Sequence, residues 1–208
     1  MYFHKHFLFY PLAALFVILL LVIGAYVIDW IAPSTNSPKG EQPRILIYMS
    51  PDSYNGNLGG RSGADAKCDL ALILGCKINR AFLSVNADDE IRDMPGNYGF
   101  KTNIPIYWYN RSSKTTTKLA NNWIDMLDGT ILSTQTVGTG YLAIAKTGSN
   151  WDGALAGCSC NGWTDETNSF CSTYGDSKYS TNEWITAWYA SCKNQSTHRC
   201  LCQVDGDS

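Results

Sequence analysis

The longest apolar segment of the chain runs from Phe7 to Ile28 and contains no charged residue. At about 1.5 Å per residue, a helix of this length crosses a hydrocarbon core about 30 Å thick. Trp30 follows the segment, at a position where aromatic side chains gather at membrane surfaces. The pattern predicts one N-terminal transmembrane helix, within residues 1–32, that anchors the protein.

The same segment has an alternative interpretation as a cleaved signal peptide. Ile23-Gly24-Ala25 offers the small residues that precede a cleavage site. The apolar run continues past Ala25, which favours retention, and Lys5 before the run with Asp29 after it places the N-terminus inside. We therefore expect a single-pass membrane protein with its C-terminal part outside the cytoplasm, or a secreted protein if the segment is cleaved.

The rest of the chain divides into a linker and one domain. Residues 33–43 are polar and contain proline and glycine, so they bury too little apolar surface to fold. Residues 44–205 have the length of a single domain with its own hydrophobic core.

Short apolar segments bounded by turn-forming residues predict strands in this domain. They are Ile45–Met49, Arg80–Val85, Pro105–Asn110, Tyr141–Ala145, Glu183–Ala190 and His198–Val204.

Helical signals lie between these segments. Ser62 can cap a helix that has Asp65 three residues later and ends at Gly75, with Cys68 on its buried stripe. Asn121–Gly129 predicts a shorter helix, whereas residues 147–182 are rich in turn formers and predict mostly loop. The combination predicts an α+β domain.

The charges exclude one class of partner. The chain has 16 Lys and Arg against 18 Asp and Glu, without a run of one sign. Binding to nucleic acid depends on many cations that neutralise phosphates. We expect no nucleic-acid partner.

All eight cysteines lie after the apolar segment, where the compartment is oxidising and disulfides persist. The close pairs Cys158-x-Cys160 and Cys200-x-Cys202 offer four thiolates, which is the alternative of a zinc site. Zinc ligands are usually separated by two or more residues, so the spacing favours disulfides and no metal.

Several motifs resemble a family of bacterial secreted or surface domains and endostatin, the C-terminal domain of a collagen. The motifs are Asn55–Cys68 with its Gly-Gly and Gly-Ala-Asp, Arg80–Ser84, Pro105–Asn110, Asn122–Gly129, Asn161–Cys171 and the final Arg199–Cys202. The resemblance covers most of the exported part and implies a C-type-lectin-like fold.

The resemblance also implies how some cysteines pair. A cysteine on the first helix would bond to one in the last strand, which maps here to Cys68 with Cys202. A second bond would join Cys192 to Cys171, or to Cys160 if the bacterial domains are the better guide. The cysteines beyond this pattern, Cys76, Cys158, Cys200 and the remaining loop cysteine, are expected to form extra bridges.

The functional sites known in this fold do not carry over. A calcium-dependent sugar site needs Glu-Pro-Asn or Gln-Pro-Asp, and the chain has neither; Asn150-Trp151-Asp152 has related residues in another order. The histidines of endostatin's zinc site and the clustered arginines of its heparin site have no counterpart, because His198 is the one histidine of the domain. We expect no metal and no cofactor.

A catalytic site is not indicated either. His198 is expected to be a partly exposed strand residue, and no nucleophile is placed beside it by the sequence. Asp88 with Asp89, and Asp165 with Glu166, are paired as glycoside hydrolysis requires, but such pairs in loops are usually solvated.

These observations favour a non-enzymatic recognition or adhesion module that binds a glycan or protein at a cell surface. Its contact surface is expected in the long loop region. The candidate residues are Trp151, Asp152, Asn161, Trp163 and Asp165. The alternative is an envelope enzyme that acts on polysaccharide.

Overall fold

The computed structural model describes residues 42–70, 74–134 and 144–206. The expected membrane segment and most of the linker lie outside these residues. Within the described ranges no helix is both long enough and apolar enough to span a bilayer. Gly40–Ser208 forms a compact unit, which is mixed α+β as expected.

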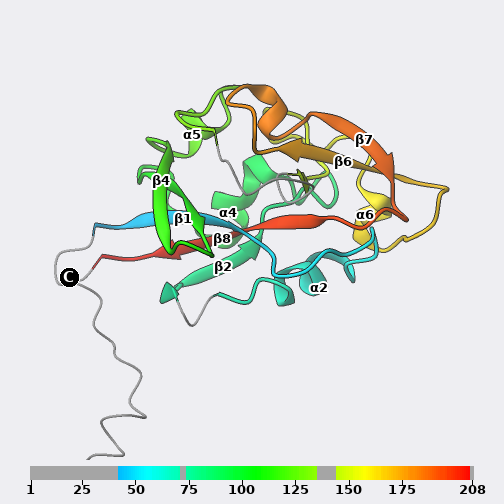
Figure 1. The fold of residues 1–208 in the computed structure, drawn as a ribbon, viewed down its shortest axis with the longest axis horizontal. Helices are drawn as coiled ribbons and strands as arrows, with labels where there is room; N and C mark the ends of the chain where they lie inside the picture. The colour runs from blue at the N-terminus through cyan, green and yellow to red at the C-terminus, as the bar shows by residue number, and fades with distance from the viewer. Residues whose placement is uncertain (1–41, 71–73, 135–143, 207–208) are drawn as a thin grey trace, which may run out of the picture. The chain divides into compact units, whose positions relative to one another are not determined.

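Eight strands of the described chain form one mixed sheet in the order β4-β3-β1-β8-β5-β6-β7, and β2 also pairs with β8. β4 and β7 therefore lie at opposite ends (Figure 1). The strands are β1 (Arg44–Met49), β2 (Ile78–Ala81), β3 (Ile106–Asn110), β4 (Thr115–Ala120), β5 (Ile144–Lys146), β6 (Cys171–Asp176), β7 (Trp188–Ser191) and β8 (Thr197–Val204).

Helices of the described chain are short. They are α2 (Gly60–Ala66), α4 (Met94–Tyr98), α5 (Trp123–Met126), α6 (Cys160–Trp163) and the 3₁₀ turns η1 (Ile91–Asp93) and η3 (Asn182–Trp184).

β1 and β8 form the centre of the domain. They pair antiparallel from Arg44 opposite Val204 to Met49 opposite Arg199. Because side chains alternate along a strand, each strand supplies both faces of the sheet. Ile45 and Leu201 enter one buried cluster, while Leu46 and the two cysteines of β8 enter the other.

The first helix differs from the predicted one. It spans Gly60–Ala66 and is preceded by Gly59, which has a left-handed φ of 86° and no side-chain cap. Asp65 does not form a capping box with Ser62: its carboxylate accepts a hydrogen bond from the Ala81 amide at 2.8 Å. The helix ends at Ala66 rather than at Gly75. The hydrogen bond from the Ala81 amide connects Asp65, near this end, to β2.

The other predicted elements vary in accuracy. The strands expected at residues 45–49, 105–110 and 198–204 are confirmed, and α5 lies inside the expected second helix, capped by Asn122. The strand expected at 80–85 lies earlier, at Ile78–Ala81, and the one expected at 183–190 is a 3₁₀ turn followed by β7. β6 occupies part of the region expected to be loop, and β4 was not predicted.

All eight cysteines form disulfides, and one expected pairing is wrong. Cys68 bonds to Cys200 rather than Cys202, and Cys202 bonds to Cys76. Both β8 cysteines face the same side, so the choice depends on register. Asp65 is held at Ala81, which lies opposite Cys200, and this brings Cys68 to Cys200.

The loop bridges follow the alternative that the bacterial domains implied. Cys192 bonds to Cys160, and Cys171 bonds to Cys158. The two members of each Cys-x-Cys pair therefore bond to different partners. Because all eight cysteines form disulfides, no thiolate is left for the alternative of a four-thiolate zinc site.

Candidate functional site

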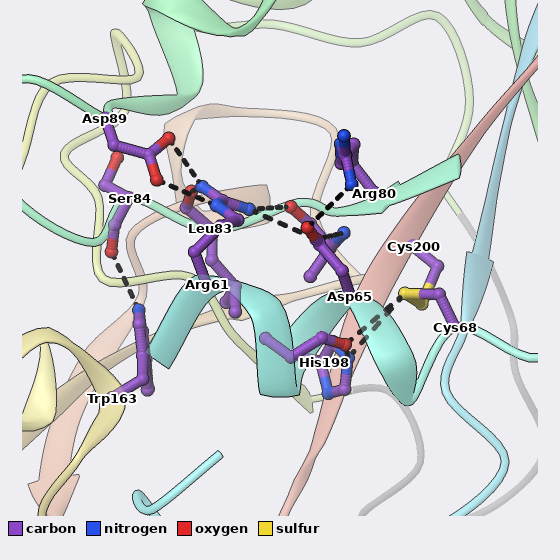
Figure 2. A network of polar contacts seen from close by, with 12 residues as sticks. Arg61, Asp65, Cys68, Arg80, Leu83, Ser84, Asp89, Trp163, His198 and Cys200 are labelled. Carbon is purple, nitrogen blue, oxygen red and sulfur yellow. Dashed lines mark hydrogen bonds and ion pairs between the residues drawn. A yellow bond between two sulfur atoms is a disulfide. The ribbon is translucent and has the colours of Figure 1, made fainter. Parts of the chain in front are cut away.

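The Gly-Gly and Gly-Ala-Asp motif builds a polar network between α2 and β2 (Figure 2). Arg61 donates from Nε and Nη2 to the two oxygens of Asp89, at 2.8 and 2.9 Å. The same guanidinium donates to the carbonyls of Ala81 and Leu83, each at 2.6 Å. Since every one of these contacts is internal to the fold, the network connects elements and leaves little of Arg61 for a ligand.

Asp65 continues this network. Its second oxygen accepts from Arg80 at 3.1 Å (Figure 2). Burial raises the pKa of Asp65, and the Ala81 amide and both arginines oppose that rise. The Tyr98 ring lies 5.4 Å from the Arg61 guanidinium and 4.9 Å from that of Arg80. The most recognisable motif of the chain therefore has a structural role.

The paired carboxylates do not face each other across a hollow. Asp89 is bound to Arg61, while its neighbour Asp88 is exposed. Asp165 accepts from the Thr167 amide at 2.7 Å and so closes its own turn. Glu166 accepts from Asn55 at 2.8 Å. Asp89, Asp165 and Glu166 are therefore engaged by groups of the protein itself.

His198 is fully buried, which corrects the expectation of partial exposure. Its Nε2 lies 3.2 Å from the carbonyl oxygen of Ala64 (Figure 2). Burial is the main reason that its pKa is lowered to about 3, so the ring is neutral at physiological pH. A neutral Nε2–H donating to that carbonyl is a core contact.

Cys68, Cys200 and His198 are grouped closely enough to hold a metal ion, with their ligand atoms within 4.8 Å of one another. Zinc binds thiolates, however, and both sulfurs are consumed by the Cys68–Cys200 disulfide. In the oxidised protein this cluster has one available ligand, the imidazole. It does not form a metal site.

Of the five residues expected to contact a ligand, Trp163 is corrected to a core residue. Its side chain has 0% exposure, and its indole donates to the Ser84 carbonyl at 2.8 Å (Figure 2). Gly148 and Val85 lie against α6, so the tryptophan packs beneath the loop. A side chain without exposed surface cannot contact a soluble ligand.

The other four candidates do not converge on one site. Trp151 is 45% exposed, and its ring packs beside Gly129. Asp152 accepts from the Ala154 amide, so it closes a local turn as Asp165 does. Asn161 is exposed in α6 with a φ of 53°.

A different surface has the character of a binding site. A hollow of about 460 Å³ lies beside β7, and we call it the aromatic hollow. Its aromatic lining residues are Tyr174, Trp188 and Tyr189. The Trp188 side chain is 48% exposed and lies on the Tyr174 face of the sheet, whereas the side chain of Tyr189, the next residue of β7, points to the other face. Its polar edge is formed by Ser53, Asn194, Gln195 and Ser196.

Sheet register places the floor of this hollow. Tyr174 on β6 lies opposite Trp188 on β7 and opposite Lys146 on β5. Residues directly opposite each other project from the same face of a sheet. The three side chains therefore form a row from the buried interior to the exposed end of the sheet.

This site was not predicted from the sequence. The signals were the adjacent Trp188 and Tyr189 and the Asn194-Gln195-Ser196 turn that follows them. Lys146, at the end of an apolar strand, was a further signal. None of them forms a recognisable motif, since residues 53, 144, 174 and 188–196 meet only through the sheet order.

Comparison with known proteins assigns no family. No protein-family model matches the chain, and no curated protein has significant sequence similarity to it. The geometry of the aromatic hollow is therefore the basis for assigning a function.

Proposed function

We propose that the protein is a membrane-anchored, extracytoplasmic recognition module that binds a neutral glycan in the aromatic hollow. The observation that carries this proposal is the combination of the exposed Trp188 ring with an uncharged polar edge in one concave surface. Ligand sites are commonly concave and largely apolar, with a few polar groups that fix orientation.

The chemistry of the hollow matches that of a sugar. A pyranose ring has apolar C–H faces that stack on an aromatic ring, which Trp188 offers. Its hydroxyls both donate and accept hydrogen bonds, as do the amides and hydroxyls of Asn194, Gln195 and Ser196. The described lining residues include no charged side chain, which favours a neutral glycan over an ionic ligand.

The proposal includes the finer fold assignment, a C-type-lectin-like domain of the endostatin kind. Its support is the antiparallel pairing of the first strand with the last and the helix α2 between β1 and β2. Further support comes from two disulfides that join the α2 region to β8 across 132 and 126 residues.

Membrane anchoring is part of the same proposal. A helix from Phe7 to Ile28 would keep the protein in the membrane pellet during carbonate extraction. A chain that starts at Pro33 should be released as a soluble protein. Recovery of the full chain in the carbonate wash, with a mature N-terminus at Tyr26, would replace the anchor with a cleaved signal.

The alternative of a polysaccharide-hydrolysing enzyme has less support. Glycoside hydrolysis usually needs two carboxyl groups beside the scissile bond. The described residues of the aromatic hollow include none, and Asp89 is bound to Arg61 elsewhere. Binding without turnover is the function that this chemistry favours.

The decisive experiment compares two tryptophans with nearly equal exposure. Trp188 is 48% exposed in the hollow, whereas Trp151 is 45% exposed beside Gly129. The full chain, purified in mild detergent, is screened on an array of neutral glycans. Trp188→Ala should lower binding at least about tenfold, since buried aromatic anchors dominate interfaces, while Trp151→Ala retains it. Equal binding by Trp188→Ala would contradict the proposal.

A further inference from the structure

Lys146 is a buried cation next to the aromatic hollow. Its side chain has 0% exposure in β5. No salt bridge within the described ranges includes it, and burying an unpaired charge is costly unless hydrogen bonds compensate. Its position therefore requires a structural reason.

Three carbonyl groups surround its amine. Nζ donates to the carbonyl oxygens of Tyr54 at 2.6 Å, Asn194 at 3.2 Å and Ser196 at 3.3 Å. A lysine ammonium has three N–H donors and no acceptor, so the charged form satisfies all three oxygens. The neutral amine has two N–H groups and a lone pair, so one of the three carbonyls loses its donor.

These carbonyls belong to two separate segments at the hollow. Tyr54 follows Ser53 on one side, and Asn194 and Ser196 belong to the turn on the other side. Tyr54 and Ser196 also exchange two backbone hydrogen bonds, each 2.9 Å long. The lysine adds a hydrogen bond to the carbonyl of Asn194, two residues before Ser196 in the turn.

Resting on the proposed glycan-binding function, the geometry points to Lys146 as the positioning residue of the aromatic hollow, whose ammonium holds both polar segments in place. It does not contact the ligand. Its three hydrogen bonds fix the backbone from which Ser53, Asn194 and Ser196 present their polar groups.

The strands beside Lys146 do not supply a negative charge. On β6, the Tyr174 ring lies 5.3 Å from Nζ, which is the distance of a cation–π contact. On β8, His198 pairs with Lys146 in the register and is neutral. Burial raises the pKa of Tyr174, so its hydroxyl is also uncharged.

In the segments above Lys146, the nearby charged groups contact the Tyr54 side chain. Lys67 from the α2 side lies 5.1 Å from the Tyr54 ring, and Asp52 accepts from the Tyr54 hydroxyl at 3.5 Å. In the turn, Lys193 is exposed. Burial lowers the pKa of Lys146 to about 7. The ammonium therefore predominates at pH 5.5 and the neutral amine at pH 8.5.

Amide hydrogen exchange of the full chain measures this positioning without a ligand. We expect the Tyr54 and Ser196 amides, corrected for intrinsic exchange, to be about fivefold to tenfold better protected at pH 5.5 than at pH 8.5, the effect of about one hydrogen bond. Lys146→Met should show the low protection at both pH values. The matched control, Lys178→Met, changes an exposed lysine and should behave as the wild type.

Oligosaccharide binding by the same proteins separates the two proposals. The probes are neutral hexasaccharides of β-linked glucose and of N-acetylglucosamine. Wild-type affinity should fall about fivefold from pH 5.5 to pH 8.5 and should be weak in Lys146→Met at both values. If protection changes as expected but neither probe binds, the positioning role stands and the glycan function is contradicted.

Two results would overturn the positioning role. One is full wild-type protection of the Tyr54 and Ser196 amides in Lys146→Met at pH 5.5, and the other is an equal loss in Lys178→Met. If Lys146→Met does not form its four disulfides, Lys146→Gln replaces it, because the glutamine amide carries two N–H donors and no charge.

Discussion

Two regions of the domain are built in different ways. The closed region consists of β1, β2, β8 and α2, and it is held by two disulfides and the Arg61 network. The hollow region consists of β5, β6, β7 and the turn at 192–196. It combines exposed aromatic side chains with a buried lysine beside a concave surface.

The recognisable sequence motif and the proposed binding site lie in different regions of this domain. The recognisable residues of α2 make internal contacts that connect α2 to β2 and to the loop at Asp89. The residues of the aromatic hollow project toward solvent, where a ligand can reach them. Function can therefore reside in residues that resemble no motif.

Removing disulfides from each region should show the largest loss of stability. Cys68 and Cys200 are 132 residues apart, whereas Cys158 and Cys171 are 13 apart. By loop-closure entropy, replacing all four cysteines of the Cys68–Cys200 and Cys76–Cys202 bridges by Ser should lower the free energy of unfolding by at least about 5 kcal/mol, because either bridge alone keeps the long loop closed. The Cys158 and Cys171 double replacement should cost about 3 kcal/mol.

Urea unfolding of residues 40–208 measures both effects. Each variant replaces both cysteines of every bridge that it removes, so that no free thiol can exchange with the remaining bridges. Equal losses in the two variants would show that loop length does not control this stability, and that local packing around each bridge decides it.

The second test compares the buried Trp163 with the half-exposed Trp188. Trp163→Ala removes a fully buried indole and its hydrogen bond to Ser84, which should cost about 3 to 5 kcal/mol of unfolding free energy. Trp188→Ala removes a half-exposed ring of the hollow and should change stability by less than about 1 kcal/mol. Thermal unfolding ranks the two variants, and a reversed order would refute the assignment of Trp163 to the core.

The Arg61 network is tested against a similar pair on the surface. Arg61 and Asp89 are 15% and 14% exposed, whereas Arg111 and its partner Asp69 are 31% and 41% exposed. Arg61→Ala leaves Asp89 without its partner and should cost about 3 kcal/mol. Arg111→Ala should cost about 0 to 1 kcal/mol in the same urea experiment. Similar losses would show that burial does not distinguish the pairs.

The closed region was largely predictable from sequence. The short apolar segments Ile45–Met49 and His198–Val204 predicted β1 and β8, and the cysteine count in a chain expected to be exported indicated disulfides. The exact partner of Cys68 was not predictable, because Cys200 and Cys202 share a face and differ only in register.

The hollow region was less predictable. β6 was not predicted, because its residues favour turns. Its pairing with β5 and β7, rather than its own propensity, stabilises it as a strand. Trp163 was assigned to a contact surface because tryptophans in loops can be exposed, and burial depends on packing that no local pattern encodes. The aromatic hollow itself needs the sheet order, which brings residue 53 beside residues 188–196.

A pH dependence distinguishes the buried His198 from the buried Lys146. Burial lowers the folded pKa of His198 to about 3, below the ordinary value of 6.5. Between these values the unfolded chain binds a proton that the folded chain does not, so stability falls as the pH falls. The contribution is about 1.4 kcal/mol for each pH unit. Urea unfolding of residues 40–208 at pH 6.5, 5.5 and 4.5 should show this loss.

His198→Gln should have a shallower acid slope than the wild type, because glutamine does not titrate and its amide can still donate to the Ala64 carbonyl. Lys146→Met should keep the wild-type slope, since Lys146, whose pKa is lowered only to about 7, is largely protonated in both states below pH 6. The difference between the variants isolates His198 from the carboxylates that also titrate in acid. If all three proteins lose stability in parallel, the buried imidazole of the closed region is not the acid-sensitive group.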